Sequence, residues 1–278
     1  MSAPLLSRVY EGGAGAVVTK SVGPRPRMGH PNPTVVAVEG GLLNAMGLPN
    51  PGAGYFTGEI ERLKEAGVPV VGSFFGASVE EFVEVARTLA GAGADALELN
   101  YSCPNVEEEM GLLGSDPANV ERITGAVKEA VNLPVFVKLT PNVADIVEIA
   151  RAAERGGADA ITAVNTLKAL AIDVDLRRPV LSNTTGGLSG PALKPVALRC
   201  VWEIAESVDI PIIGVGGVSG WRDAVEFLLC GASVVEIGTA VMTRGFEVFR
   251  EVAEGIRGYL AQNGFKEVRE IVGLAHEA

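Results

Sequence analysis

The chain has 278 residues, a formal net charge of −11 and three cysteines. This length fits one large α/β barrel, and the negative charge argues against a nucleic-acid partner. The cysteines form no CxxC pair, so they predict neither a disulfide framework nor a zinc site and fit a reducing cytoplasm. We find no signal peptide and no apolar stretch that could span a bilayer, and we expect a cytoplasmic protein without a membrane partner.

Short apolar runs alternate with helical patterns along the whole chain. Hydrophobic residues make up 47% and aromatic residues only 5%, which is typical of parallel strands buried on both faces. The predicted strands are Ala16–Thr19, Val68–Phe74, Ala96–Asn100, Val135–Leu139, Ala160–Val164, Pro211–Val215 and Val234–Ile237. The predicted helices are Pro4–Glu11, Glu59–Ala66, Val79–Ala92, Pro117–Val131, Ala144–Arg155, Pro195–Ser207 and Trp221–Cys230.

This order predicts βα units and a parallel sheet. Because a helix opens the chain and seven strands follow, we expect a (β/α)8 TIM barrel that lacks its first strand, as one domain over residues 1–278. A doubly wound open sheet is less favoured, since no GxGxxG motif follows the first strand. Two long connections, Ser21–Gly54 with a hairpin-like segment at Thr34–Leu43, and Leu167–Leu193, are expected to be functional.

In a barrel, active sites lie at the carboxyl ends of the strands. The third predicted strand ends in Asn100-Tyr101-Ser102-Cys103-Pro104-Asn105, which places a thiol between two amides. Cys103 is the leading acid/base candidate, because a thiol can exchange a proton and the two histidines lie elsewhere in the sequence. An inert core thiol is the structural alternative, and it is our interpretation of Cys200 and Cys230.

Glycine-rich turns follow the last two predicted strands. Barrels often bind phosphate at this place, and the two turns are Gly214-Val215-Gly216-Gly217 and Ile237-Gly238-Thr239. The glycines of either turn taken alone could simply allow a tight turn. Lys20 and Lys138 lie at strand ends, and together they would suit an electron-rich ring. Either lysine taken alone could instead extend its ammonium toward solvent. Asn44, Asn100, Asn105 and Asn165 would share this face and indicate a ligand with several amide-like edges.

Six motifs in one order connect the chain to a known family. They are Val18-Thr19-Lys20-Ser21, Asn44-Ala45-Met46-Gly47-Leu48, the Asn100–Asn105 motif, Val164-Asn165-Thr166, Gly186-Gly187-Leu188-Ser189-Gly190-Pro191 and Gly214-Val215-Gly216-Gly217. From Gly13 to about Val272 the sequence resembles the class 1 dihydroorotate dehydrogenases, and among them the type-B catalytic subunit. The resemblance implies one FMN per chain and oxidation of dihydroorotate to orotate in pyrimidine (UMP) biosynthesis.

The resemblance also assigns residues. Cys103 would take the proton from C5 of the substrate while C6 gives hydride to FMN. The substrate would be held by Lys20, Asn44, Met46, Gly47, Leu48, Asn100, Asn105, Asn165 and Thr166. The cofactor would be held by Lys20, Ser21, Ser73, Asn100, Lys138, Val164, Gly190, Gly216, Gly217, Gly238 and Thr239. The segment Val106–Asp116 would act as a lid.

Type-B members pass electrons to NAD through a second subunit that carries FAD and an iron–sulfur cluster. This chain has no cysteine cluster, so such a cluster would belong to a partner. The resemblance implies a homodimer or a heterotetramer. A dihydropyrimidine dehydrogenase-like enzyme and a non-catalytic barrel subunit are the alternative functions, and the intact motif around Cys103 speaks against the second.

Two departures from the family pattern have consequences. Ser73 stands where these enzymes usually have an asparagine near the flavin. The family also begins with a strand and a small-residue loop that contact the flavin, whereas here Met1-Ser2-Ala3-Pro4 leads directly into the first helix. Since a missing strand exposes two sheet edges, we expect the chain as written to bind FMN weakly or to be poorly stable.

Overall fold

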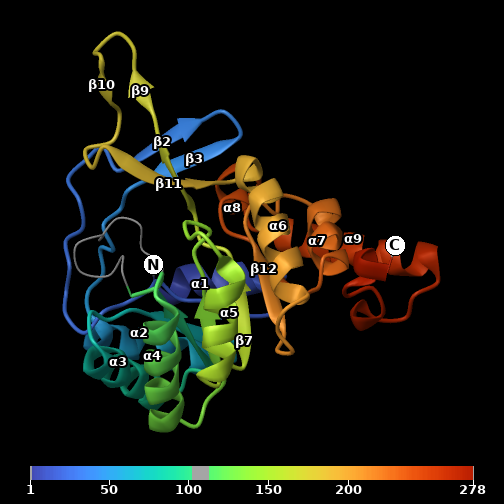
Figure 1. Ribbon diagram of the computed structural model, residues 1–278, viewed down its shortest axis with the longest axis horizontal. Coiled ribbons are helices and arrows are strands. Elements are labelled where there is room, and N and C mark those ends of the chain that lie inside the picture. The colour runs from blue at the N-terminus through green and yellow to red at the C-terminus, as the bar shows by residue number, and fades with distance from the viewer. Residues whose placement is uncertain (1, 102–112, 278) are drawn as a thin grey trace.

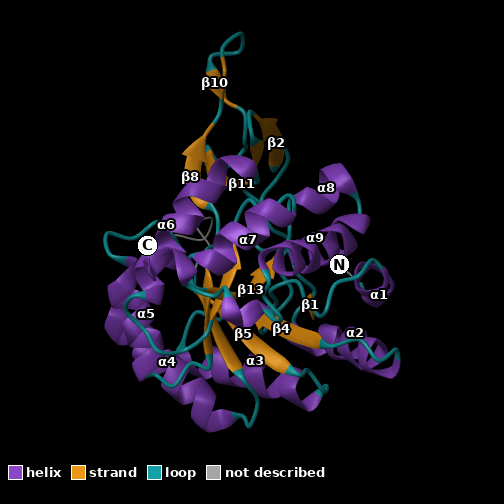
Figure 2. Cartoon of the chain, turned by 90° about the vertical axis from the view of Figure 1, so that its right-hand side faces the viewer, coloured by secondary structure: helices purple, strands orange, loops and turns teal. Residues whose placement is uncertain are grey.

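A seven-stranded parallel sheet forms the centre of the molecule in a computed structural model that describes residues 2–101 and 113–277 (Figure 1). Its strand order is β1-β4-β5-β6-β7-β12-β13. The strands are β1 (Val17–Val18), β4 (Val70–Phe74), β5 (Ala96–Asn100), β6 (Val135–Lys138), β7 (Ala160–Ala163), β12 (Ile212–Val215) and β13 (Ala232–Glu236). All seven predicted strands are confirmed, and together they form a curled, barrel-like sheet (Figure 2).

Helices cover the outside of this sheet. They are α1 (Ala3–Glu11), α2 (Ala53–Glu65), α3 (Val79–Gly91), α4 (Pro117–Ala130), α5 (Ile146–Arg155), α6 (Lys194–Ala205), α7 (Trp221–Leu229), α8 (Ala240–Arg244) and α9 (Glu247–Asn263), with short 3-10 turns at Pro191–Leu193, Val268–Glu270 and Leu274–Glu277. In α3 the Ser78 side chain accepts a hydrogen bond from the Glu81 amide and caps the helix. Phe82, Val85, Ala86 and Leu89 repeat at helical spacing and are fully buried against the sheet.

The structure corrects several sequence predictions at the level of elements. Helix α2 begins at Ala53 rather than Glu59, and both α8 and α9 were missed. Cys200 is buried as expected, but Cys230 is only partly buried and lies just beyond the end of α7. Burial raises the pKa of both thiols, so neither favours the thiolate form.

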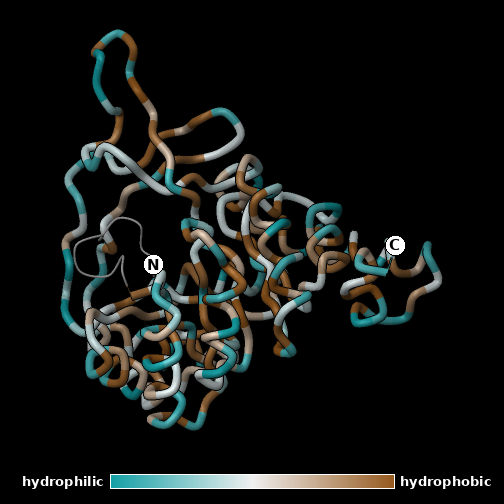
Figure 3. The backbone as a smooth tube through the Cα atoms, viewed as in Figure 1, coloured by the Kyte–Doolittle hydropathy of each residue, from teal (hydrophilic) through white to brown (hydrophobic). Residues whose placement is uncertain are grey.

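The two long connections meet in a second, antiparallel sheet with the order β2-β3-β11-β8. Its strands are β2 (Val35–Val38), β3 (Gly41–Asn44), β8 (Leu167–Leu170) and β11 (Thr185–Ser189), so the predicted hairpin is confirmed. Beyond it, β9 (Ile172–Asp173) and β10 (Arg178–Pro179) form an arm that projects from the body (Figure 1). Leu170, Ile172 and Val174 on the arm and its approach are exposed. Hydrophobic stretches of the arm are brown in Figure 3.

Strands β1 and β13 are the two edges of the parallel sheet. Within the described residues, no strand pairs with the outer side of either one. Val234 of β13 is 55% exposed, whereas strands β5 and β7 are buried throughout. This arrangement agrees with the prediction of a barrel without one of its strands. In the part of the chain that the structure describes, no helix has the length and apolar character needed to cross a membrane.

Candidate active site

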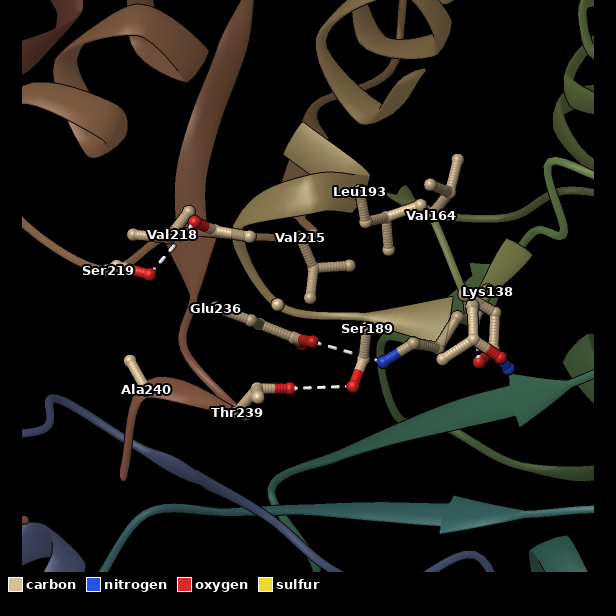
Figure 4. Close-up of a pocket in the computed structure, with 16 residues that line it drawn as sticks. Lys138, Val164, Ser189, Leu193, Val215, Val218, Ser219, Glu236, Thr239 and Ala240 are labelled. Carbon is tan, nitrogen blue, oxygen red and sulfur yellow. Dashed lines mark hydrogen bonds and ion pairs between the residues drawn. The ribbon is translucent and has the colours of Figure 1, made fainter. Parts of the chain in front are cut away.

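A pocket opens at the carboxyl ends of β6, β7, β12 and β13 (Figure 4). It brings together most of the predicted cofactor residues. The first and last of these in the pocket, Lys138 and Thr239, are 101 positions apart in the sequence. Its lining consists of Lys138, Val164, Asn165, Thr166, Ser189, Gly190, Leu193, Val215, Gly216, Gly217, Val218, Ser219, Glu236, Gly238, Thr239 and Ala240. The pocket therefore lies on the face where barrel enzymes place their active sites.

Backbone geometry requires glycine in the turn that follows β12. Gly216 and Gly217 have φ angles of +130° and +83°, which side chains of L-residues rarely allow. A Cβ on Gly217 would lie 2.8 Å from the Lys194 Cβ, whereas a Cβ on Gly238 would meet nothing within 4 Å. Bare backbone thus lines one end of the pocket with room beside it, which suits a phosphate group.

Lys138 shares its ammonium between two carboxylates. Its Nζ lies 3.1 Å from Glu236 Oε2 and 3.6 Å from Glu98 Oε1, and its side chain is 17% exposed. Burial alone would lower the pKa of Lys138, but Glu236 and Glu98 outweigh it and raise that pKa. A permanent positive charge therefore faces the pocket, where it can stabilise negative charge on a bound ring.

A chain of polar side chains connects the predicted residues of β1, β4, β5 and β7. The hydroxyls of Ser21 and Ser73 are 2.9 Å apart, and Asn100 Nδ2 donates to Ser21 Oγ at 3.0 Å. Asn165 Nδ2 donates in turn to Asn100 Oδ1 at 3.4 Å. Ser73 is buried in this network and also donates to Glu98 Oε1 at 3.3 Å.

The predicted substrate residues at the end of β3 and in the segment after it do not line the pocket. Asn44 Nδ2 donates to the Gly187 carbonyl at 3.2 Å. The Arg27 side chain donates to the Gly47 carbonyl at 3.0 Å, and the His30 amide donates to the Met46 carbonyl at 3.0 Å. Leu48 is buried with a φ of +54°, an uncommon conformation for a residue other than glycine.

Several predicted residues cannot be placed in the pocket. Lys20 is partly buried just after β1 and is not among the residues that line it. Cys103 and Asn105 lie outside the described residues, as does most of the predicted lid Val106–Asp116. Tyr101, the last described residue before them, is buried and its hydroxyl lies 3.1 Å from Thr124 Oγ1. The assigned roles of these residues therefore stay predictions.

Sequence reasoning missed the two carboxylates that partner Lys138. Glu98 and Glu236 lie in strands whose other residues are apolar or small, Ala96-Leu97-Glu98-Leu99 and Val234-Val235-Glu236-Ile237. A charged residue inside such a run is costly to bury without a partner, and that signal could have identified both. No side-chain cluster with metal-ligand composition occurs in residues 2–101 and 113–277.

Comparison with known proteins identifies the family. The family model described as dihydroorotate dehydrogenase matches residues 2–260. Two similar relatives are catalytic subunits of dihydroorotate dehydrogenase B (NAD(+)). The one from Pyrococcus furiosus is 54% identical, over 100% of this chain and 92% of its own length. The one from Methanosarcina mazei is 53% identical, over 96% and 85%.

A solved structure agrees at the level of the fold. It is described as DHODH in complex with ferulenol from Eimeria tenella, and it aligns with a TM-score of 0.86 and 23% identity over 100% of this chain and 83% of that one. The family match and the sequence similarity show that this chain belongs to the dihydroorotate dehydrogenase family.

Proposed function

We propose that this chain is the catalytic FMN subunit of an NAD-linked dihydroorotate dehydrogenase, acting in the cytoplasm in UMP biosynthesis. The observation that carries the proposal is the pocket at the strand ends, which is lined by most of the residues that the family resemblance assigns to the cofactor. The names of the archaeal relatives support the same reaction. We take residues 1–278 as one FMN-binding domain that holds one cofactor.

The chemistry of the pocket suits a flavin mononucleotide at both ends. Gly216, Gly217, Gly238 and Thr239 offer backbone without bulky side chains for the phosphate. Lys138 offers a fixed positive charge for the ring, while Val164 and Gly190 line the surface between them. FMN, when bound, supplies the acceptor for the substrate hydride.

The residues of the chain itself bind, orient and deprotonate the substrate in this proposal. Asn100, Asn165 and Thr166 present amide and hydroxyl groups beside the pocket, and hydrogen bonds hold the two asparagines together. In this proposal the substrate site is completed by Lys20, Asn44, Met46, Gly47, Leu48 and Asn105. Ser21 and Ser73 belong to the cofactor site. Cys103 accepts the C5 proton, so that C6 can release its hydride.

A partner subunit completes the electron path. We propose that electrons leave the FMN for a second subunit carrying FAD and an iron–sulfur cluster and then reach NAD, in a homodimer or a heterotetramer. The printed names of the relatives, which call them catalytic subunits, support the presence of a second subunit.

The test of the proposed base is anaerobic bleaching of the flavin by dihydroorotate at neutral pH. Cys103→Ala should slow it by roughly 10²- to 10⁴-fold, because the C5 proton loses its acceptor. Cys230→Ala is the matched control, since Cys230 lies at the end of α7 and does not line the pocket. An unchanged rate in Cys103→Ala would exclude Cys103 as the base.

A further inference from the structure

Glu98 is a carboxylate in the interior of the sheet that the proposed reaction does not use. Its side chain is 1% exposed, and its Oε2 finds no hydrogen-bond partner among the described residues. Ser73 on β4 pairs with Glu98 in the strand register, so the two side chains share one face, and the Ser73 hydroxyl donates to Glu98 Oε1. A buried carboxylate with one unsatisfied oxygen is poorly suited to remain ionised.

The charges that act on Glu98 come from two other strands. Lys138 on β6 lies 3.6 Å from Glu98 Oε1, and the same ammonium lies 3.1 Å from Glu236 on β13. The facing groups of β4 and β7 are the uncharged hydroxyls of Ser73 and Thr162. Burial is the main reason that the pKa of Glu98 is raised, to about 7, with Lys138 opposing and Glu236 reinforcing the change. The ionised state of Glu98 therefore depends on its share of one ammonium.

Hydride transfer into the pocket changes this balance. A hydride carries two electrons and one proton, so its arrival adds one net negative charge beside Lys138. The ammonium is then attracted to three negative groups instead of two, and its pairing with Glu98 weakens. Of the two carboxylates that pair with Lys138, Glu98 is the more buried. Glu236 is 20% exposed, so water can solvate its charge.

We propose that Glu98 is a proton-uptake site that takes one proton from solvent when the cofactor beside Lys138 is reduced. This inference rests on the proposed function. The proton forms an O–H bond on the Glu98 carboxylate and leaves water or buffer at the mouth of the barrel, and no electrons move in this step. Its route is the pair of hydroxyls at Ser73 and Ser21, which lie 2.9 Å apart and lead from Glu98 to the partly buried Ser21.

The first measurement is the reduced-minus-oxidised infrared spectrum of the FMN-loaded protein at pH 8, recorded after photoreduction. The wild type should gain a band of a protonated carboxyl group, and Glu98→Gln should lack it. Glu121→Gln is the matched control, because Glu121 forms a surface ion pair with Arg155 far from the pocket, and it should keep the band. A wild-type spectrum without the band would overturn the proposal.

The second measurement is the number of protons taken up per two electrons, from the pH dependence of the flavin midpoint potential. Wild type and Glu121→Gln should take up one proton more than Glu98→Gln above pH 7, and equal counts would contradict the proposal. If Glu98→Gln does not fold, the wild-type count and band decide. Failure of the wild type to bind FMN even when the cofactor is in excess would instead refute the proposed function.

The route has its own test in Ser73→Ala. This variant should delay proton uptake after a reducing flash, which a pH-indicator dye follows. Uptake as fast as in the wild type would exclude the path through Ser73.

Discussion

At Gly217, the backbone leaves no space for a side chain. A Cβ there would lie 2.8 Å from the Lys194 Cβ and 2.9 Å from the Gly190 carbonyl oxygen, and the φ of +83° already disfavours other residues. Because Gly190 and Gly217 both line the pocket, a shift of either one alters the surface that we assign to FMN.

Gly217→Ala should therefore weaken FMN binding and lower the free energy of unfolding by about 1–3 kcal/mol. Fluorescence titration of FMN and denaturant unfolding measure the two effects. Gly258→Ala in α9 is the control, since a Cβ there meets nothing within 4 Å, and it should be neutral or stabilising by up to about 1 kcal/mol. Equal FMN affinity in wild type and Gly217→Ala would argue against this end of the pocket as the cofactor site.

Glu98 should make stability depend on pH in the FMN-free protein. Its pKa is raised from 4.5 to about 7 on folding, so the folded state binds the proton more tightly, and stability is full below pH 4.5 and falls as pH rises through 7. The loss approaches about 3 kcal/mol. Denaturant unfolding at pH 5 and pH 8 should show a larger decrease in the wild type than in Glu98→Gln. Parallel pH profiles would count against a buried, neutral Glu98.

At the level of elements, Asp223 ties helix α7 to helix α6 beside the glycine turn. Its carboxylate accepts hydrogen bonds from the amides of Ser219 and Gly220 at 2.9 Å and from Lys194 Nζ at 2.7 Å. Burial alone would raise the pKa of Asp223, but Lys194 and the two amides outweigh it and lower that pKa. This carboxylate stabilises the start of α7 and, with it, the turn that precedes it.

Asp223→Asn should lower the free energy of unfolding by about 1–2 kcal/mol at neutral pH. Since the pKa of Asp223 is depressed on folding, the difference from wild type should shrink as pH falls below 3.8, where the unfolded carboxylate takes a proton. Urea unfolding at pH 7 and pH 3 measures it. Glu121→Gln, which breaks an exposed ion pair, should cost less than about 1 kcal/mol, and an equal cost would show that Asp223 has no special role.

Elements were predictable where the local pattern was strong. The strands Ala96–Asn100 and Val135–Lys138 are mostly apolar, and both agree with prediction to within a residue. Helix α2 begins six residues earlier than predicted, at Ala53 rather than Glu59. Gly54 and Gly58 lower the helix propensity there, while burial of Phe56 and Ile60 compensates. In α9, Gly255 likewise lowers the helix propensity. Glycine is needed there because the helix approaches Trp221 so closely that a Cβ would collide with it.

The site was only partly predictable, because some of its contacts join strands that are far apart in the sequence. Strand-end glycines and lysines follow a rule of the fold, so Lys138, Gly216 and Gly217 could be named from sequence. The sharing of one ammonium between Glu98 and Glu236 depends on strands that are 138 positions apart, and no local pattern reports it. The pairing of β11 with β3, across more than 140 residues, was hidden in the same way.

At the scale of the whole molecule, the open edges at β1 and β13 are the main structural liability. Because unpaired edges favour strand pairing between molecules, we expect the protein to bind FMN weakly or to melt at a low temperature. Light scattering, the flavin-to-protein ratio and thermal unfolding measure these properties. A yellow preparation with one FMN per chain and an ordinary melting temperature would contradict this expectation.

In the proposed function, the pocket couples the oxidation of dihydroorotate to the reduction of FMN. The most direct measurement is anaerobic absorbance of the flavin, with FMN in excess, after addition of dihydroorotate or of dihydrouracil. We expect bleaching by dihydroorotate with formation of orotate, and much slower bleaching by dihydrouracil, which lacks the carboxylate. Bleaching by dihydrouracil alone, or by neither compound, would contradict it.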